Sequence, residues 1–184
     1  MKYIEVELKF FCPIPREVID RLASLGGIRG KQTRQVDSYY NAPHRDFLLP
    51  DTISEWLRLR VEDGSASINY KNWLPVDSVV KTHCDEYESV VSDVEALRRT
   101  LTALDFTPLV VVDKVRQEWH FDEVTVAIDD VASLGSFIEF EFCGDAESVD
   151  EALERLSKFT ADLGVALGEP MHLGYPHLLL GRER

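Results

Sequence analysis

The sequence of 184 residues is short of cysteine, and the cysteines that it has follow no metal-binding or disulfide pattern. Cys12, Cys84 and Cys143 are odd in number and lack the spacing of metal ligands. A disulfide framework and a zinc site are therefore both disfavoured. We expect a reduced, cytoplasmic protein in which all three cysteines are structural.

Long apolar runs and positive charge are also scarce. No apolar run is long enough to span a bilayer, and we expect no signal peptide, because the chain begins with a strand-like segment. The 20 Lys and Arg residues face 33 Asp and Glu residues, which gives a net charge of −13 at pH 7. Nucleic acids and anionic membranes bind basic protein surfaces, so neither is an expected partner of this acidic protein. An anion would have to be bound by a local cluster of Lys and Arg or through a bridging metal.

The length predicts a single domain over residues 1–184. We expect a monomer or a homodimer, although the length does not decide between them. Predicted helices cover residues 15–25, a segment that follows a capping box at Ser92, a segment from a second capping box at Ser148 to Gly164, and a short closing stretch at 174–181. Predicted strands cover residues 4–9, 35–40, 56–62, 66–72, 85–91, 111–121, 124–129 and 136–143. These elements predict an α+β fold built on an eight-stranded antiparallel barrel with flanking helices.

Most of these strands combine one charged face with one apolar face. Residues 4–9, 56–62 and 137–142 alternate with a period of two, which separates the two kinds of side chain. Acidic pairs occupy the first and last strands, and basic pairs occupy the middle ones. A sheet with one face in water explains any single strand. The segregated charges leave a second interpretation equally open, in which they converge on an anion and its metal.

Converging charges of this kind have a definite chemistry. Hard divalent cations such as Mg²⁺ and Mn²⁺ prefer carboxylate oxygens, while Arg and Lys pair with phosphate oxygens. The candidate metal ligands are Glu5, Glu7, Asp129, Glu139 and Glu141. Together these groups suit a polyphosphate chain, because phosphoryl transfer needs mostly positioning and charge neutralisation.

The N-terminal pattern Glu5-x-Glu7-x-Lys9 resembles the ExExK signature of the CYTH family, the triphosphate tunnel metalloenzymes. The order of the charged strands extends the resemblance over nearly the whole chain. The family fold is an eight-stranded antiparallel barrel that holds a triphosphate in its bore with Mg²⁺ or Mn²⁺. The resemblance therefore implies that the charged faces line a tunnel.

Three stretches, residues 25–27 (LGG), 37–43 (DSYYNAP) and 56–63 (WLRLRVED), are most similar to thiamine triphosphatases within this family. The resemblance implies that Trp56 stacks on an organic group and that Tyr39 and Lys71 orient and activate the attacking water. It implies substrate contacts for Lys9, Arg58, Arg60, Lys71, Lys114, Arg116, Glu86 and Glu88. It assigns the metal to the five carboxylates named above, with Asp130 as a weaker stand-in for Asp129.

Three other readings stay open at this point. Residues 88–141 resemble class IV adenylyl cyclases comparably well, although the His-Phe pair of that branch is not found before Glu5. Hydrolysis of inorganic tripolyphosphate is a second reading. The third is a non-catalytic polyphosphate-binding module, because residues 171–175 carry no Lys or Arg where the family usually has one, and His172 is a weak substitute.

Overall fold

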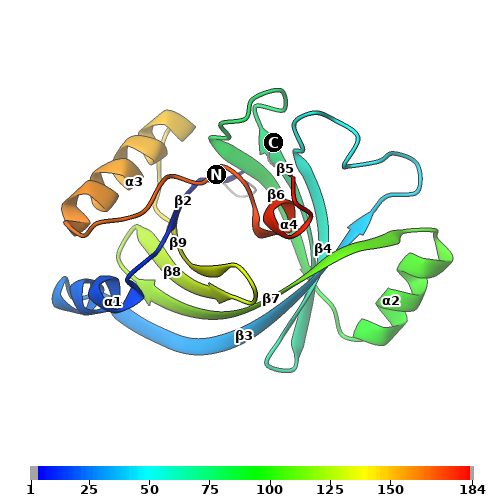
Figure 1. Cartoon of the computed structure of the whole chain (residues 1–184), viewed down its shortest axis with the longest axis horizontal. Helices are drawn as coiled ribbons and strands as arrows, with labels where there is room; N and C mark the ends of the chain where they lie inside the picture. Colours follow the sequence, from blue (N-terminus) through cyan, green and yellow to red (C-terminus); the bar gives the residue numbers. More distant parts are fainter. Residues whose placement is uncertain (1–3, 183–184) are drawn as a thin grey trace. The chain divides into compact units, whose positions relative to one another are not determined.

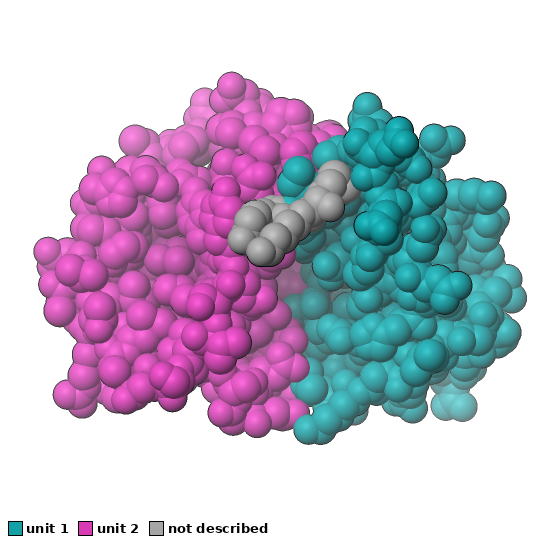
Figure 2. All heavy atoms as spheres, turned by 180° about the vertical axis from the view of Figure 1, so that it is seen from behind, with its two compact units in different colours: residues 1–33, 114–172 teal, residues 34–113, 173–184 magenta. Residues whose placement is uncertain are grey.

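The computed structural model describes residues 4–182, which form two compact units (Figure 2). Unit 1 contains residues 4–33 and 114–172, and unit 2 contains residues 34–113 and 173–182. Two long strands, β3 (Ile28–Asn41) and β7 (Thr107–His120), contribute residues to both units.

Nine strands form one sheet in the order β1-β6-β5-β4-β3-β7-β8-β9-β2 (Figure 1). Besides β3 and β7 they are β1 (Ile4–Glu5), β2 (Glu7–Phe11), β4 (Glu55–Glu62), β5 (Ser65–Leu74), β6 (His83–Val90), β8 (Val124–Val131) and β9 (Gly135–Phe142). The pairs β3–β4, β4–β5, β5–β6, β7–β8, β8–β9 and β9–β2 are antiparallel. Val6 divides the predicted first strand into β1 and β2, which stand at opposite ends of this order. The order is that of a nearly closed antiparallel barrel and confirms the predicted fold class, with nine strands instead of eight.

Four helices accompany the sheet: α1 (Pro15–Ser24), α2 (Val94–Ala103), α3 (Val149–Leu163) and the short α4 (Tyr175–Leu179). Ser148 caps α3 as predicted, because its side chain accepts a hydrogen bond from the Glu151 amide at 3.2 Å. The predicted cap of α2 at Ser92 is wrong. Asp93 accepts the hydrogen bond from the Ala96 amide instead, at 2.9 Å. Serine and aspartate are equally good N-caps, so the pattern alone could not separate these adjacent residues.

In unit 1, α1 and α3 cover the apolar face of the strands (Figure 1). Leu22 of α1 and Leu156 of α3 are fully buried with Ile138 and Phe140 of β9. In unit 2, a smaller cluster joins Leu101 of α2 to apolar side chains of β3 and β4. Helices α1, α2 and α3 therefore lie on the apolar side of the strands of their own unit, as the alternation predicted.

Two strands begin four or more residues earlier than predicted. β3 begins at Ile28 instead of Gln35, and β7 begins at Thr107 instead of Val111. Most side chains of residues 28–34 are exposed, so this stretch has no apolar alternation to mark it. Hydrogen bonds hold it in place: the Gln117 amide donates to the Gly30 carbonyl at 2.7 Å.

The loop predicted between residues 73 and 84 is shorter, because β5 runs to Leu74 and β6 begins at His83. Within residues 4–182, no helix combines the length and the apolar character that a membrane crossing requires.

Candidate active site

In unit 1, the strand register gathers the predicted charged residues on one face. Lys9 lies opposite Glu139, Glu7 opposite Glu141, and Arg116 opposite Asp129. Residues directly opposite each other on antiparallel strands point to the same side of the sheet. The unit 1 charged face consists of Glu7, Lys9, Lys114, Arg116, Asp129, Glu139 and Glu141.

Asp129 is the fully buried centre of this face. Its Oδ2 accepts from Lys114 Nζ at 2.7 Å, and its two oxygens accept from Arg116 Nε and Nη2 at 2.7 and 2.6 Å. Burial raises the pKa of this carboxyl group, but Arg116 and Lys114 outweigh burial and hold the pKa below its ordinary value. Asp129 is therefore an anion that fixes two cations in place.

Glu139 and Lys9 form the second part of this face. Lys9 Nζ lies 3.0 Å from Glu139 Oε1 and 3.4 Å from Glu7 Oε1, and Arg116 donates to the other oxygen of Glu139. Burial raises the pKa of Glu139, but Lys9, Arg116 and Lys114 together hold it well below the ordinary value. All the cations of this face thus have carboxylate partners.

The predicted metal ligands fit Mg²⁺ or Mn²⁺ in their donor chemistry, since all are carboxylates. Glu7 and Glu141 lie opposite each other, and Glu139 is on the same face. Glu5, at the end of β1, is buried. Among the residues described, however, no three acidic, histidine or cysteine side chains are grouped closely enough to hold a metal ion. Lys9 stands between Glu7 and Glu139, so a metal held by these residues requires Lys9 to shift. The metal stays a prediction.

In unit 2, the register builds a second charged face. Asp37 lies opposite Arg60, Arg58 opposite Asn69, and Lys71 opposite Glu86. The unit 2 charged face consists of Asp37, Arg58, Arg60, Asn69, Lys71, Glu86 and Glu88. Every residue of unit 2 that was predicted to contact phosphate lies on it.

Asp37 is the buried anion of this second face, with 1% of its surface exposed. Its two oxygens accept from Arg60 Nε and Nη2, both at 2.7 Å, and its Oδ2 lies 3.5 Å from Arg58 Nη1. Asp37 is a functional candidate that the sequence analysis did not single out. A signal was present, since Asp37 shares the face of Tyr39 in the predicted strand 35–40.

Glu86 contacts two further residues of the unit 2 charged face, Asn69 and Lys71. Its Oε1 accepts from Asn69 Nδ2 at 2.5 Å and lies 3.5 Å from Lys71 Nζ. Glu88 accepts from Ser67 at 2.7 Å. The Oδ1 atom of Asn69 is buried and has no hydrogen-bond partner in the part of the chain that the structure describes. Buried acceptors are normally satisfied, which favours a bound water or ligand at this point.

Tyr39 and Trp56 also lie on this face, in contact with each other. Their rings meet edge to face with centroids 5.5 Å apart, and the His177 ring of α4 lies 4.7 Å from Trp56. Burial raises the pKa of Tyr39 against the opposing influence of Arg58, so the phenol stays protonated at neutral pH. Trp56 is only 4% exposed and offers a substrate ring little surface while His177 stays in place. Its stacking role remains a prediction.

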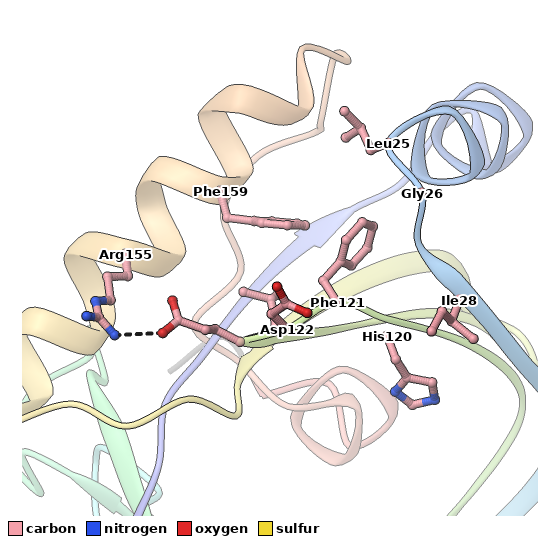
Figure 3. A pocket seen from close by; sticks show the side chains of 10 residues that line it. Leu25, Gly26, Ile28, His120, Phe121, Asp122, Arg155 and Phe159 are labelled. Atoms are coloured by element: carbon pink, nitrogen blue, oxygen red, sulfur yellow. Dashed lines mark hydrogen bonds and ion pairs between the residues drawn. The ribbon is translucent and has the colours of Figure 1, made fainter.

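A pocket of about 520 Å³ in unit 1 is lined by none of the residues of the unit 1 charged face. The Phe121 and Phe159 rings, which both line it, contact each other edge to face with centroids 5.0 Å apart, and an ion pair of 2.9 Å joins Arg155 to Glu123 in the same lining (Figure 3). Gly27 packs so closely that an added Cβ would lie 2.5 Å from the Phe121 ring. This pocket is separate from the predicted phosphate contacts.

The ion pairs of the unit 1 charged face predict that acid destabilises the protein. The folded protein lowers the pKa of Glu139 and Asp129 from their ordinary values of 4.5 and 3.8. Their ionised forms therefore stabilise the fold above these values, and this stability is lost as the pH falls below them. We expect the urea midpoint to fall between about pH 5 and pH 3.

The Glu139→Gln variant is the control for this acid sensitivity, because glutamine does not titrate. Its urea midpoint should be lower than that of the wild type at pH 7 and should fall less as the pH decreases. Equal pH slopes for the two proteins would show that Glu139 does not carry the effect.

A family model described as the CYTH domain matches residues 3–172 of the chain. A protein of Methanocaldococcus jannaschii, provisionally named as the adenylate cyclase MJ0240, is 31% identical over 176 residues, which cover 95% of this chain and 98% of that protein.

Solved structures also resemble the chain along its length. The PH1819 protein of Pyrococcus horikoshii has a TM-score of 0.79 and 29% identity, and the match covers 96% of this chain and 98% of that one. The Hippeastrum protein HpAC1, described as an adenylyl cyclase candidate with a dominant triphosphatase activity, has a TM-score of 0.64 and 15% identity, with 97% and 96% covered. At that identity HpAC1 supports the fold alone.

Proposed function

Because this chain belongs to the CYTH family, we propose that it is a metal-dependent triphosphatase. Its proposed substrate is thiamine triphosphate or inorganic tripolyphosphate. Hydrolysis of the terminal phosphate would release orthophosphate and leave thiamine diphosphate or pyrophosphate. The observation that carries the proposal is the pair of charged faces, each with cations fixed by a buried aspartate. Such fixed cations stabilise the charge on transferring phosphoryl groups without reorganising during the reaction.

The proposed roles follow from the contacts of each side chain. Arg58, Arg60 and Lys71 in unit 2, and Lys9, Lys114 and Arg116 in unit 1, bind phosphate oxygens. Glu86 and Glu88 hold Lys71, Asn69 and Ser67 beside them. The protonated phenol of Tyr39 donates a hydrogen bond to the attacking water or to a phosphate oxygen, and Lys71 acts with it.

A divalent metal fits the donor chemistry of the unit 1 carboxylates. Glu7, Glu139 and Glu141 would hold Mg²⁺ or Mn²⁺, with Glu5 and Asp129 as further ligands, and the metal would neutralise charge on the phosphate oxygens. Lys9 already supplies positive charge between Glu7 and Glu139. The unit 1 charged face would thus combine a carboxylate-rich metal site with phosphate-binding cations.

A second candidate is an adenylyl cyclase that converts ATP to cyclic AMP and pyrophosphate. The naming of the M. jannaschii relative, which matches nearly the whole chain, favours it. The same cations would bind the triphosphate of ATP, so the charged faces support either reaction. The two differ in the nucleophile, which is water in the hydrolase and a ribose hydroxyl in the cyclase.

We expect purified protein with Mg²⁺ or Mn²⁺ to release phosphate from thiamine triphosphate, tripolyphosphate or ATP. Removing the metal with EDTA should lower the rate by about 10²-fold or more, because an electrostatic stabiliser of the transition state is lost. Phosphate release and cyclic AMP are measured in the same reactions, and added Mg²⁺ should restore activity after EDTA.

Each alternative outcome of this experiment has a distinct meaning. Cyclic AMP as the main product would replace the hydrolase proposal with the cyclase. Tight binding of tripolyphosphate without turnover in any metal would favour the non-catalytic binding module. An unchanged rate in EDTA would overturn the metal requirement.

A further inference from the structure

The two charged faces share one arrangement of residues, although different pairs of strands form it, β3–β4 in unit 2 and β7–β8 in unit 1. In each face, a buried aspartate lies directly opposite an arginine and binds it through both carboxylate oxygens. The same aspartate also contacts a second cation two residues before that arginine. Asp129 does this with Lys114 and Arg116, and Asp37 does it with Arg58 and Arg60.

We propose that Asp37 is a positioning residue that fixes Arg60, and with it Arg58, in the orientation that binds the triphosphate. This inference rests on the proposed function and extends it to a residue that does not itself touch the substrate.

The geometry of Arg60 supports this role. Asp37 engages two of its three guanidinium nitrogens, Nε and Nη2. Within residues 4–182, the third nitrogen, Nη1, has no protein partner, and it carries two further N–H donors. Arg60 also lines a pocket of about 350 Å³ together with Ser67 and Glu88, and Asp37 does not. The carboxylate thus binds the Arg60 guanidinium without itself lining the pocket.

The net charge of Asp37, Arg58 and Arg60 predicts that the loss of Asp37 affects substrate binding and turnover differently. Asp37 with Arg58 and Arg60 carries a net charge of +1, and removing the carboxylate charge raises it to +2. An anionic substrate should then bind at least as tightly, because attraction increases. Turnover should nevertheless fall, because Arg60 loses the bidentate bond that fixes its plane.

The test is the Asp37→Asn variant, which keeps the size of the side chain and removes its charge. We expect kcat for the preferred triphosphate to fall about 10- to 100-fold, with KM unchanged or lower. The matched control is Asp113→Asn, which breaks an exposed Arg34–Asp113 pair of the same bidentate type in unit 2. This control should keep both constants of the wild type.

A double-mutant cycle separates positioning from folding. If Asp37 acts through Arg60, the Asp37→Asn/Arg60→Lys protein should have about the kcat of its slower single variant. Rates are taken well below each thermal midpoint and normalised to the folded fraction, so a loss of stability alone leaves kcat unchanged.

Different results would contradict the positioning role of Asp37 and the proposed function. Wild-type turnover in Asp37→Asn, independent effects in the cycle, or a kcat loss that disappears on normalisation would overturn the positioning role alone. A wild-type protein that neither binds nor hydrolyses any triphosphate would overturn the proposed function, and the positioning role with it.

Discussion

Replacing Arg58 with alanine should lower triphosphate turnover by about 10²–10³-fold while the protein stays folded. Arg58 lies centrally on the unit 2 charged face, opposite both Tyr39 and Asn69. Its loss removes a guanidinium that stabilises developing phosphate charge. The fold should survive because Asp37 keeps its two hydrogen bonds to Arg60. Steady-state kinetics measure the loss, and circular dichroism with thermal unfolding checks the fold.

The matched control for Arg58→Ala is Arg99→Ala, which removes a guanidinium of the same unit. Arg99 is exposed on α2, and among residues 4–182 its guanidinium pairs only with Glu95, one helical turn away. Its substitution should leave turnover at the wild-type rate. If Arg58→Ala also hydrolyses triphosphate at the wild-type rate, the unit 2 charged face is not the phosphate-binding surface.

The strands that could be predicted well from the sequence are those whose signals are local. The β4–β5 hairpin is within two residues of its prediction at every end, because Asp63 and Gly64 supply the positive φ angles of its turn. The early part of β3 could not be predicted in this way. Its side chains are mostly exposed, and hydrogen bonds such as that from Gln117 to Gly30 hold it.

In the candidate site, too, the features with a local sequence signal could be predicted and those that depend on strand pairing could not. Alternation alone shows which side chains share a face of one strand, so the charged positions could be predicted. Their partners could not, because register depends on which strands become neighbours. Nothing local links Asp37 to Arg60 or Asp129 to Arg116. For this reason the sequence predicts neither the contacts of Asp37 with Arg58 and Arg60 nor those of Asp129 with Lys114 and Arg116.

The paired charges explain how an acidic protein can offer cations to an anion. Lys9, Lys114 and Arg116 are largely buried, and burying a cation alone costs several kcal/mol. Carboxylates next to them offset this cost in the absence of substrate. The same contacts fix the cations in place, so less conformational freedom is lost when a triphosphate binds.

Asp129→Asn tests how strongly the unit 1 charged face depends on its central anion. The substitution leaves Lys114 and Arg116 with positive charge that Asp129 no longer balances, and Lys114 is only 3% exposed. Breaking a buried ion pair in this way costs about 3–5 kcal/mol in the free energy of unfolding. Urea unfolding at pH 7 measures the loss.

The neighbouring aspartate provides the control for Asp129→Asn, and it also tests the assignment of the site. Asp130 is exposed and points to the opposite face of β8, so Asp130→Asn should change the free energy of unfolding by no more than about 0.5 kcal/mol. Equal losses for the two variants would contradict the central role of Asp129. If Asp129 is only a metal ligand, Asp129→Asn will alter the metal requirement and leave the metal-free protein as stable as the wild type. A large loss in EDTA would instead identify Asp129 as the anion that holds Lys114 and Arg116 in place before any metal or triphosphate binds.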